Sequence, residues 1–91
     1  MKEKPESYRL FISSKASRKL KNISKLINKI EIAAALQEIE EDPWNSGKPL
    51  GEELTGRFSF HLKVFRIIYR INKQNLVIQV LDADHRSTIY N

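Results

Sequence analysis

The sequence predicts an α+β fold in which an N-terminal strand and an antiparallel helix pair pack on one face of a mainly antiparallel sheet. Apolar residues recur at steps of three and four over residues 16–34 and alternate with polar residues over 58–71. These spacings are the periods of a helix and of a half-buried strand. Between the two regions, residues 42–56 hold all three glycines and two of the three prolines, which predicts a long irregular connection there.

The helical part is preceded by a short strand at residues 8–12, which is rich in aromatic and β-branched residues. Ser13 or Ser14 offers the side-chain oxygen that an N-cap requires. One apolar stripe then follows at helical spacing: Ala16, Leu20, Ile23, Ile27, Ile30 and Ala34. Asn22 and Ser24 are poor helix-interior residues, so we expect a short helix and then a longer one that stops before Pro43.

The strand part contains three consecutive strands joined by tight connections, which predicts an antiparallel meander. A turn at Lys63-Val64 separates the first two strands, and a turn at residues 72–75 leads into a nearly continuous apolar strand at 76–81, expected near the sheet centre. Residues 82–90 are expected to bend and to form a final short strand. One apolar set should face the helices: Phe58, Phe60, Leu62, Ile67, Tyr69 and Ile71. The opposite, open face should then carry Ser59, His61, Lys63, Arg66 and Arg70.

The composition excludes several classes of protein. The chain has 91 residues, 41% of them hydrophobic and 30% charged, which fits one globular domain over residues 1–91. The longest apolar run, residues 32–36, is far shorter than the roughly 20 residues that span a membrane. No signal-peptide pattern opens the chain, so the expected location is the cytoplasm. Cysteine is absent and only two histidines occur, so no metal and no cofactor are assigned.

The net charge of +5 is unevenly distributed along the chain. Residues 1–30 hold nine Lys or Arg and two Glu, residues 31–56 hold one Lys and seven acids, and residues 57–91 hold six basic and two acidic residues. A basic surplus is typical of proteins that meet a phosphate backbone, and it also suits an acidic protein partner. The helix lysines can equally serve solubility alone. The acidic run at 38–42 favours a solvated edge over a contact with a basic surface.

Three segments carry a resemblance to a known family: Leu-Thr-Gly-Arg-Phe at 54–58, Phe-Arg-Ile-Ile-Tyr at 65–69 and His-Arg-Ser-Thr-Ile-Tyr at 85–90. In this order, after a helical pair ending at Asp42-Pro43, the chain from Tyr8 to Tyr90 resembles the RelE/ParE superfamily of toxins. The resemblance implies a RelE-like fold and a toxin held inactive in a hetero-oligomer by a cognate antitoxin, expected from the adjacent gene. The RelE branch cleaves mRNA on the ribosome without a metal, whereas the ParE branch inhibits DNA gyrase. Fold alone does not choose between them.

The resemblance also assigns site residues. Arg66 matches an arginine that contacts the reacting phosphate, and Arg86 and Tyr90 match a closing segment that helps to bind and cleave. His61 stands where many relatives carry arginine or lysine, and its ordinary pKa near neutrality suits a general base or acid. Further RNA contacts are expected from Arg57, Lys63, Arg70 and His85. Trp44 is expected to pack the helix end onto the sheet.

Cleavage of RNA without a metal needs a base for the 2′-hydroxyl, cations for the phosphate and an acid for the leaving oxygen. Arginine suits the second task because its planar guanidinium binds phosphate oxygens in pairs. The preferred hypothesis is therefore a ribosome-dependent mRNA endonuclease, and inhibition of gyrase is the alternative. A binding module without activity is a third reading, because the chain stops one residue after Tyr90.

Overall fold

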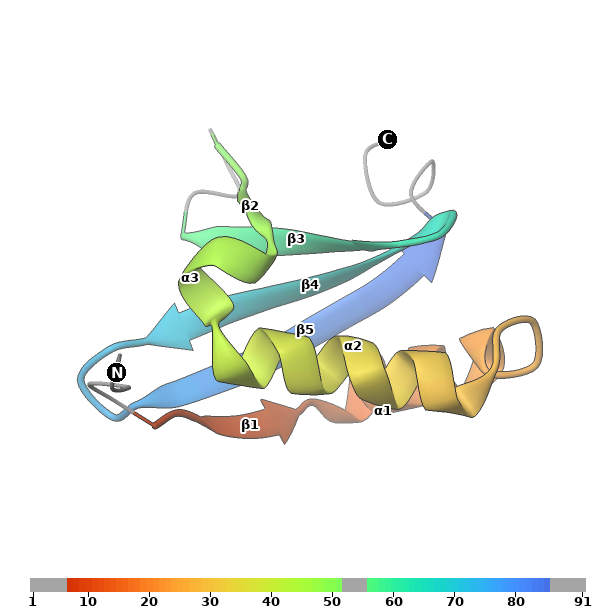
Figure 1. Cartoon of the computed structure of the whole chain (residues 1–91), viewed down its shortest axis with the longest axis horizontal. Helices are drawn as coiled ribbons and strands as arrows, with labels where there is room; N and C mark the ends of the chain where they lie inside the picture. The colour runs from red at the N-terminus through yellow and green to blue at the C-terminus, as the bar shows by residue number, and fades with distance from the viewer. Residues whose placement is uncertain (1–6, 52–55, 86–91) are drawn as a thin grey trace, which may run out of the picture.

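The computed structural model describes residues 7–51 and 56–85. The elements in chain order are β1 (Arg9–Ile12), α1 (Ser14–Ile23), α2 (Lys29–Glu41), α3 (Pro43–Ser46), β2 (Lys48–Pro49), β3 (Arg57–Leu62), β4 (Phe65–Asn72) and β5 (Val77–His85). The strands form one sheet in the order β1-β5-β4-β3-β2, in which β1 pairs with β5 in parallel and the other pairs are antiparallel. Figure 1 shows this order, with α2 crossing one side of the sheet. The predicted fold class is confirmed.

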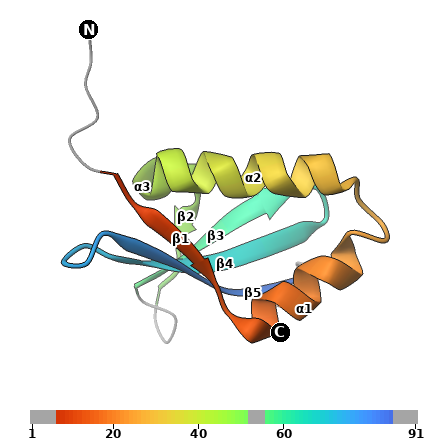
Figure 2. The same cartoon turned by 90° about the horizontal axis from the view of Figure 1, so that it is seen from below.

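The two longer helices begin at side-chain caps. Ser13 accepts a 3.0 Å hydrogen bond from the backbone N–H of Ala16, which confirms it as the cap of α1. Asn28 accepts a 2.7 Å bond from the N–H of Ile30 and so caps α2. Between them the chain turns over residues 24–28, and Figure 2 shows α1 beside β5 and α2 above the sheet.

The predicted continuous apolar stripe is correct for α1 and wrong for α2. Ala16, Leu20 and Ile23 are buried, but Ile30 is 75% exposed and Ala34 is also exposed. The buried residues of α2 are instead Ile32, Ala35 and Ile39. The cap at Asn28 starts a second helix with its own axis, so the positions that face the core are counted afresh from that cap.

The connection after α2 is more regular than predicted. Pro43 opens the short helix α3, where its missing N–H costs nothing, and Lys48–Pro49 adds an edge strand to β3. Trp44 packs as expected: its ring and that of Phe58 meet edge to face with centroids 5.9 Å apart, and its Nε1 donates to the hydroxyl of Tyr8 at 3.2 Å. The acidic residues before Pro43 are exposed, as expected. Residues 52–55 lie outside the described part of the chain.

The strands follow the predicted meander with one correction. The turn at Lys63-Val64 is confirmed, and Lys63 adopts a positive φ of 57° to close it. The bend expected within residues 82–90 does not occur at residues 82–85, where β5 continues to His85. The pairing of β4 with β5 shifts between Ile68 and Tyr69, so that Leu81 is an extra residue on β5. A bulge of this kind absorbs the irregularity and lets the strand continue. The predicted final strand near Tyr90 lies outside the described residues.

The core lies between the sheet and the helices. Phe60, Ile67 and Tyr69 are buried on the face toward α2, and Phe58, Leu62 and Ile71 pack partly buried against them, as predicted. The strand that was expected near the sheet centre is β5, which lies in the interior between β1 and β4, with Ile78 and Val80 fully buried. This leaves the other face of β3, β4 and β5 to carry the polar side chains.

Candidate functional site: a cation-bearing sheet face

The residues that point away from the core form three rows across β3, β4 and β5. The first row is His61, Arg66 and Asp84, the second is Ser59, Ile68 and Asp82, and the third is Arg57, Arg70 and Gln79. Directly opposed residues on neighbouring strands share a face of the sheet. We call this face, with Arg57, His61, Arg66 and Arg70, the cation face. Three of these four were predicted to lie together, and Arg57 joins them in the structure.

The middle row corrects the expectation of a uniformly open polar face. Ser59 is 3% exposed and Ile68 is 5% exposed. Arg66 is half-buried, and its Nη1 donates a 3.3 Å hydrogen bond to the Oγ of Ser59. The buried Ser59 and Ile68 therefore separate the pair of His61 and Arg66 from the pair of Arg57 and Arg70. The hydrogen bond to Ser59 also holds the Nη1 of Arg66 close to the sheet.

The third row places two like charges opposite each other. Arg57 and Arg70 are direct partners across β3 and β4, and both are exposed. Like charges in this arrangement repel and destabilise a sheet. An anion placed between them would relieve that repulsion.

Two predicted site residues lie elsewhere. Lys63 was expected on the open face, but its Nζ lies 3.4 Å from the Oε1 of Glu31 on α2, the helix that covers the other face. His85 pairs with Phe65 on the core side of the sheet, and the two rings meet edge to face at 5.8 Å. Both residues still lie at the same end of the sheet as His61. Arg86 and Tyr90 lie outside the described residues.

The sequence reasoning missed a cluster of paired charges beside the cation face. The Nζ of Lys19 on α1 lies 2.6 Å from the Oδ2 of Asp84 and 3.6 Å from the Oδ1 of Asp82. Lys15 lies 3.4 Å from Asp82. The hydrogen bond to Lys19 lowers the pKa of Asp84, and the same bond raises the pKa of Lys19. The alternation of Asp82 and Asp84 on one strand and the i, i+4 spacing of Lys15 and Lys19 are the sequence signals that could have revealed it.

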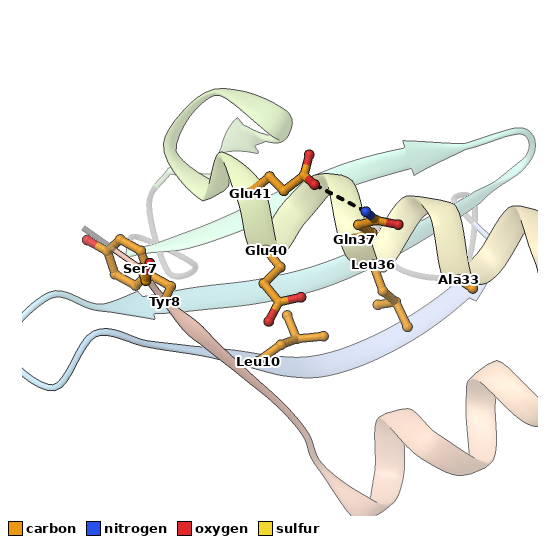
Figure 3. Close-up of a pocket in the computed structure, with 8 residues that line it drawn as sticks. All are labelled: Ser7, Tyr8, Leu10, Ala33, Leu36, Gln37, Glu40 and Glu41. Atoms are coloured by element: carbon orange, nitrogen blue, oxygen red, sulfur yellow. Dashed lines mark hydrogen bonds between the residues drawn. The ribbon is translucent and has the colours of Figure 1, made fainter. Parts of the chain in front are cut away.

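Two surface grooves lie on the opposite side of the molecule, and both are lined in part by Leu36. The first, about 620 Å³, lies between β1 and α2 and is drawn in Figure 3. Its lining residues are Ser7, Tyr8, Leu10, Ala33, Leu36, Gln37, Glu40 and Glu41. The second, about 360 Å³, is lined by Ile12, Ser17, Leu20, Lys21, Ser24, Lys29, Ile32 and Leu36. One groove thus carries acidic side chains and the other carries lysines.

Other kinds of site find no support in residues 7–51 and 56–85. No three His, Asp or Glu side chains within these ranges gather closely enough to hold a metal ion. Within the same part of the chain, no helix is both long and apolar enough to cross a membrane.

Comparison with known proteins gives concordant results. The family described as ParE toxin of type II toxin-antitoxin system, parDE, matches residues 10–90. Toxin RelG of Mycobacterium tuberculosis is 31% identical over 83 residues, which cover 91% of this chain and 95% of that protein. The toxin-antitoxin complex RelBE2 from the same organism contains a chain of similar structure, with a TM-score of 0.77 at 30% identity, covering 89% of this chain and 100% of that one.

More distant structures share the fold. A YafQ mutant from E. coli superposes with a TM-score of 0.74 at 11% identity, covering 92% of this chain and 99% of that one. The archaeal RelE-RelB complex from Pyrococcus horikoshii contains a chain with a TM-score of 0.65 at 19% identity. The match covers 89% of this chain and 97% of that one. At these identities the likeness concerns the fold alone.

Proposed function

The chain belongs to the RelE/ParE superfamily and is a toxin of a type II toxin-antitoxin system, and on this premise we propose that it cleaves mRNA on the ribosome. The proposed reaction takes place in the cytoplasm and requires no metal. The observation that carries the proposal is the cross-strand pair of His61 and Arg66 on the cation face. This pair puts a titratable imidazole next to a fixed guanidinium, which are the two kinds of group that the reaction needs.

In the proposed reaction the phosphate of the cleaved bond lies against Arg66. The Nη1 of Arg66 donates to the Oγ of Ser59, and the positive charge of the guanidinium would stabilise the charge that develops on the phosphate. His61 is exposed and can exchange a proton with the 2′-hydroxyl or the leaving 5′-oxygen. Arg86 and Tyr90, which follow β5, would complete the site.

The remaining cations are proposed to bind the flanking nucleotides. Arg57 and Arg70 lie two rows from Arg66, at roughly 13 Å for four residues of strand. They would hold the backbone on one side of the reacting phosphate. Lys63 and His85, at the end of the sheet beyond His61, would meet the strand on the other side.

Expression of the chain without antitoxin tests the proposal. Growth should stop, and primer extension on ribosome-bound mRNA should show new cut sites. Arg66→Ala should remove both effects, whereas the control Arg18→Ala, which changes an exposed arginine on α1, should keep them. Equal cleavage by the Arg66 variant and the starting protein would refute this site.

The match to the ParE family favours a second candidate, inhibition of DNA gyrase. In that case growth would stop without new mRNA ends, and the DNA damage response would be induced. The charges of the cation face would then be dispensable. The same Arg66 and Arg18 variants therefore separate the two functions.

The antitoxin is proposed to cover the two grooves that share Leu36. The second groove has an apolar floor with Lys21 and Lys29 among its lining residues, while Glu40 and Glu41 line the first groove. An amphipathic antitoxin helix with acids at one end and basic residues at the other would match this polarity. The double variant Lys21→Glu/Lys29→Glu should bind the antitoxin more weakly in calorimetric titration, and Lys73→Glu in the β4–β5 turn should not. Unchanged affinity of the double variant would place the antitoxin elsewhere.

A further inference from the structure

The third row of the cation face continues onto β1, where it ends in an aromatic side chain. Gln79 of β5 is the register partner of Arg70 on β4 and also of Phe11 on β1. Register partners on neighbouring strands share a face of the sheet, so Phe11 lies on the same face as Arg57 and Arg70. Neighbouring strands lie about 4.8 Å apart, so the row from Arg57 to Phe11 spans roughly 14 Å.

The neighbours of Phe11 in β1 confirm the direction of its side chain. Leu10 and Ile12 are the register partners of Ile78 and Val80, which are fully buried on the core side of the sheet. Successive side chains of a strand point to opposite faces, so Phe11 points away from the core. Phe11 is 50% exposed there. Half of its surface is therefore open to a ligand.

A cation lies over the ring of Phe11. The Cζ of Arg9 is 5.5 Å from the ring centroid, a distance at which the guanidinium is attracted by the π electrons. Within residues 7–51 and 56–85, no carboxylate forms an ion pair with Arg9. Arginine both stacks on aromatic rings and binds phosphate oxygens. The pair thus combines an aromatic surface with a charge that no described acid neutralises.

The charges around Phe11 favour an anionic ligand. Together with Arg9, the third row carries only positive charges. The acids of this face, Asp82 and Asp84, lie in the other two rows, where Lys15 and Lys19 form ion pairs with them. Exposed aromatic rings among arginines are typical of surfaces that bind single-stranded RNA, because the bases stack on the rings while the cations follow the backbone.

We propose that Phe11 is a stacking site for one base of the RNA on the cation face, and that Arg9 contacts the phosphate beside that base. This rests on the proposed function, because it assumes that RNA binds this face. The backbone would follow Arg57 and Arg70 across the strands, and the base would stack on the side of the ring that Arg9 does not cover. The site extends the proposed RNA path from Arg66 to the β1 edge of the sheet.

Binding of a short single-stranded 2′-O-methyl RNA, which cannot be cleaved, tests the proposal by fluorescence anisotropy on the full chain. Phe11→Ala should weaken binding about fivefold, the lower end of the range for a base stacked on an aromatic ring. Phe11→Leu keeps an apolar side chain without a ring and should lose as much, whereas Phe11→Trp should bind at least as tightly as the starting protein. Ile12→Ala is the matched control, because Ile12 is the next residue of β1, is 40% exposed and faces the other side.

Removal of a base from the RNA tests the contact from the other side. In a series of the same RNA, each member lacks the base of one nucleotide. One position should cost the starting protein about fivefold in affinity and cost Phe11→Ala nothing further, because the ring and the base belong to one contact. Equal losses in both proteins at every position would overturn the proposal. Phe11→Ala should also keep the salt dependence of binding, whereas Arg9→Met should make its slope shallower by about 0.7.

Two comparisons keep the outcomes separate. A loss with Arg66→Ala but none with Phe11→Ala or Phe11→Leu would contradict only the stacking site, and no loss with any of them would contradict RNA binding on the cation face. No measurable binding by the starting protein would also contradict the stacking site, while primer extension still decides the proposed function.

The β1 edge could instead contact a protein. If Phe11→Ala weakened binding of the antitoxin in calorimetric titration and left RNA binding unchanged, Phe11 would belong to a protein interface and the proposal would fail. Thermal unfolding shows whether each variant is folded. If Phe11→Ala does not fold, Phe11→Leu replaces it in every comparison with the same expected results.

Discussion

The hydroxyl of Tyr69 donates a 2.7 Å hydrogen bond to the carbonyl oxygen of Pro43. This bond ties the central strand β4 to the start of α3, and Tyr69 is fully buried with its ring stacked on Phe58 at 5.4 Å. Burial raises the pKa of Tyr69 to about 12, because the charged phenolate would lose its hydration. The phenol therefore remains a donor throughout the neutral range and fixes the connection between the helices and the meander.

Tyr69→Phe should lower the free energy of unfolding by about 1–3 kcal/mol, because the buried carbonyl of Pro43 loses its donor. The measurement is urea unfolding at neutral pH. An unchanged midpoint and slope would show that water replaces the hydroxyl without cost.

The same tyrosine predicts an alkaline limit of stability. Its pKa is raised from the ordinary value of 10.0 to about 12 in the folded protein. The stability that it contributes is therefore fully present below pH 10 and is lost as the pH rises from 10 to about 12, where the unfolded chain releases the proton more readily. The difference in unfolding free energy between the starting protein and Tyr69→Phe should shrink over this interval. A constant difference would contradict the assignment.

Gly47 and Gly51 form a matched pair for testing how closely the chain after α3 approaches the sheet. A Cβ added at Gly47 would lie 2.7 Å from the hydroxyl oxygen of Tyr69 and 2.9 Å from the backbone oxygen of Ser59, whereas one at Gly51 meets nothing within 4 Å. Gly47→Ala should therefore destabilise the protein by about 1–3 kcal/mol, as overpacking does. Gly51→Ala should change the melting temperature little, and equal effects of the two variants would be inconsistent with this packing.

The ion pair between Lys19 and Asp84 predicts an acid dependence of stability. Hydrogen bonding to Lys19 lowers the pKa of Asp84 below its ordinary value of 3.8. The stability that this ion pair contributes is therefore fully present above pH 3.8. It is lost as the pH falls through the lower pKa that Asp84 has in the folded protein, because the carboxylate is then protonated in both the folded and the unfolded states. Asp84→Asn should cost less than about 1 kcal/mol at neutral pH, since both side chains are about one-third exposed. This difference should vanish in strong acid, and its persistence there would indicate a packing effect instead of an ionic one.

The sequence sufficed for those elements whose signals are local. The period of two over β3 and β4 predicted which residues enter the core, and the Ser13 cap and the Lys63-Val64 turn depend on a few neighbouring residues. The predicted stripe names the wrong core-facing residues of α2 because it continues the spacing of α1 across Asn28, which caps a separate helix. The Lys19–Asp84 pair joins residues 65 positions apart. Only the parallel pairing of β1 with β5, which places α1 beside β5, makes that contact evident.

Local alternation likewise predicted most of the charged residues of the cation face, but not their burial or the direction of Lys63. Alternation put His61, Arg66 and Arg70 on one face, but it could not show that Ser59 and Ile68 are buried between them. The alternation does not extend to Lys63, because this residue lies in the turn between β3 and β4 and not in a strand. The positive φ of Lys63 and its contact with Glu31 are properties of the hairpin tip.

The opposed arginines of the third row lead to a prediction in which stability and RNA binding change in opposite directions. Arg57 and Arg70 repel each other across β3 and β4 in the absence of an anion. Arg70→Thr removes this repulsion and introduces a residue that favours strands, so the free energy of unfolding should rise by roughly 0.2–1 kcal/mol. The same change removes a proposed phosphate contact and should weaken binding of a short single-stranded 2′-O-methyl RNA, which cannot be cleaved, as measured by fluorescence anisotropy.

The salt dependence of that binding measures the lost contact directly. Each phosphate contact to a single strand adds about 0.7 to the slope of log affinity against log salt, so Arg70→Thr should make the slope shallower by about this amount. Gln79→Thr is the control, because Gln79 lies opposite Arg70 in the same row but carries no charge. A more stable Arg70 variant with an unchanged slope would mean that the repulsion is real but that no phosphate binds there, and the RNA path would then be confined to the row of His61 and Arg66.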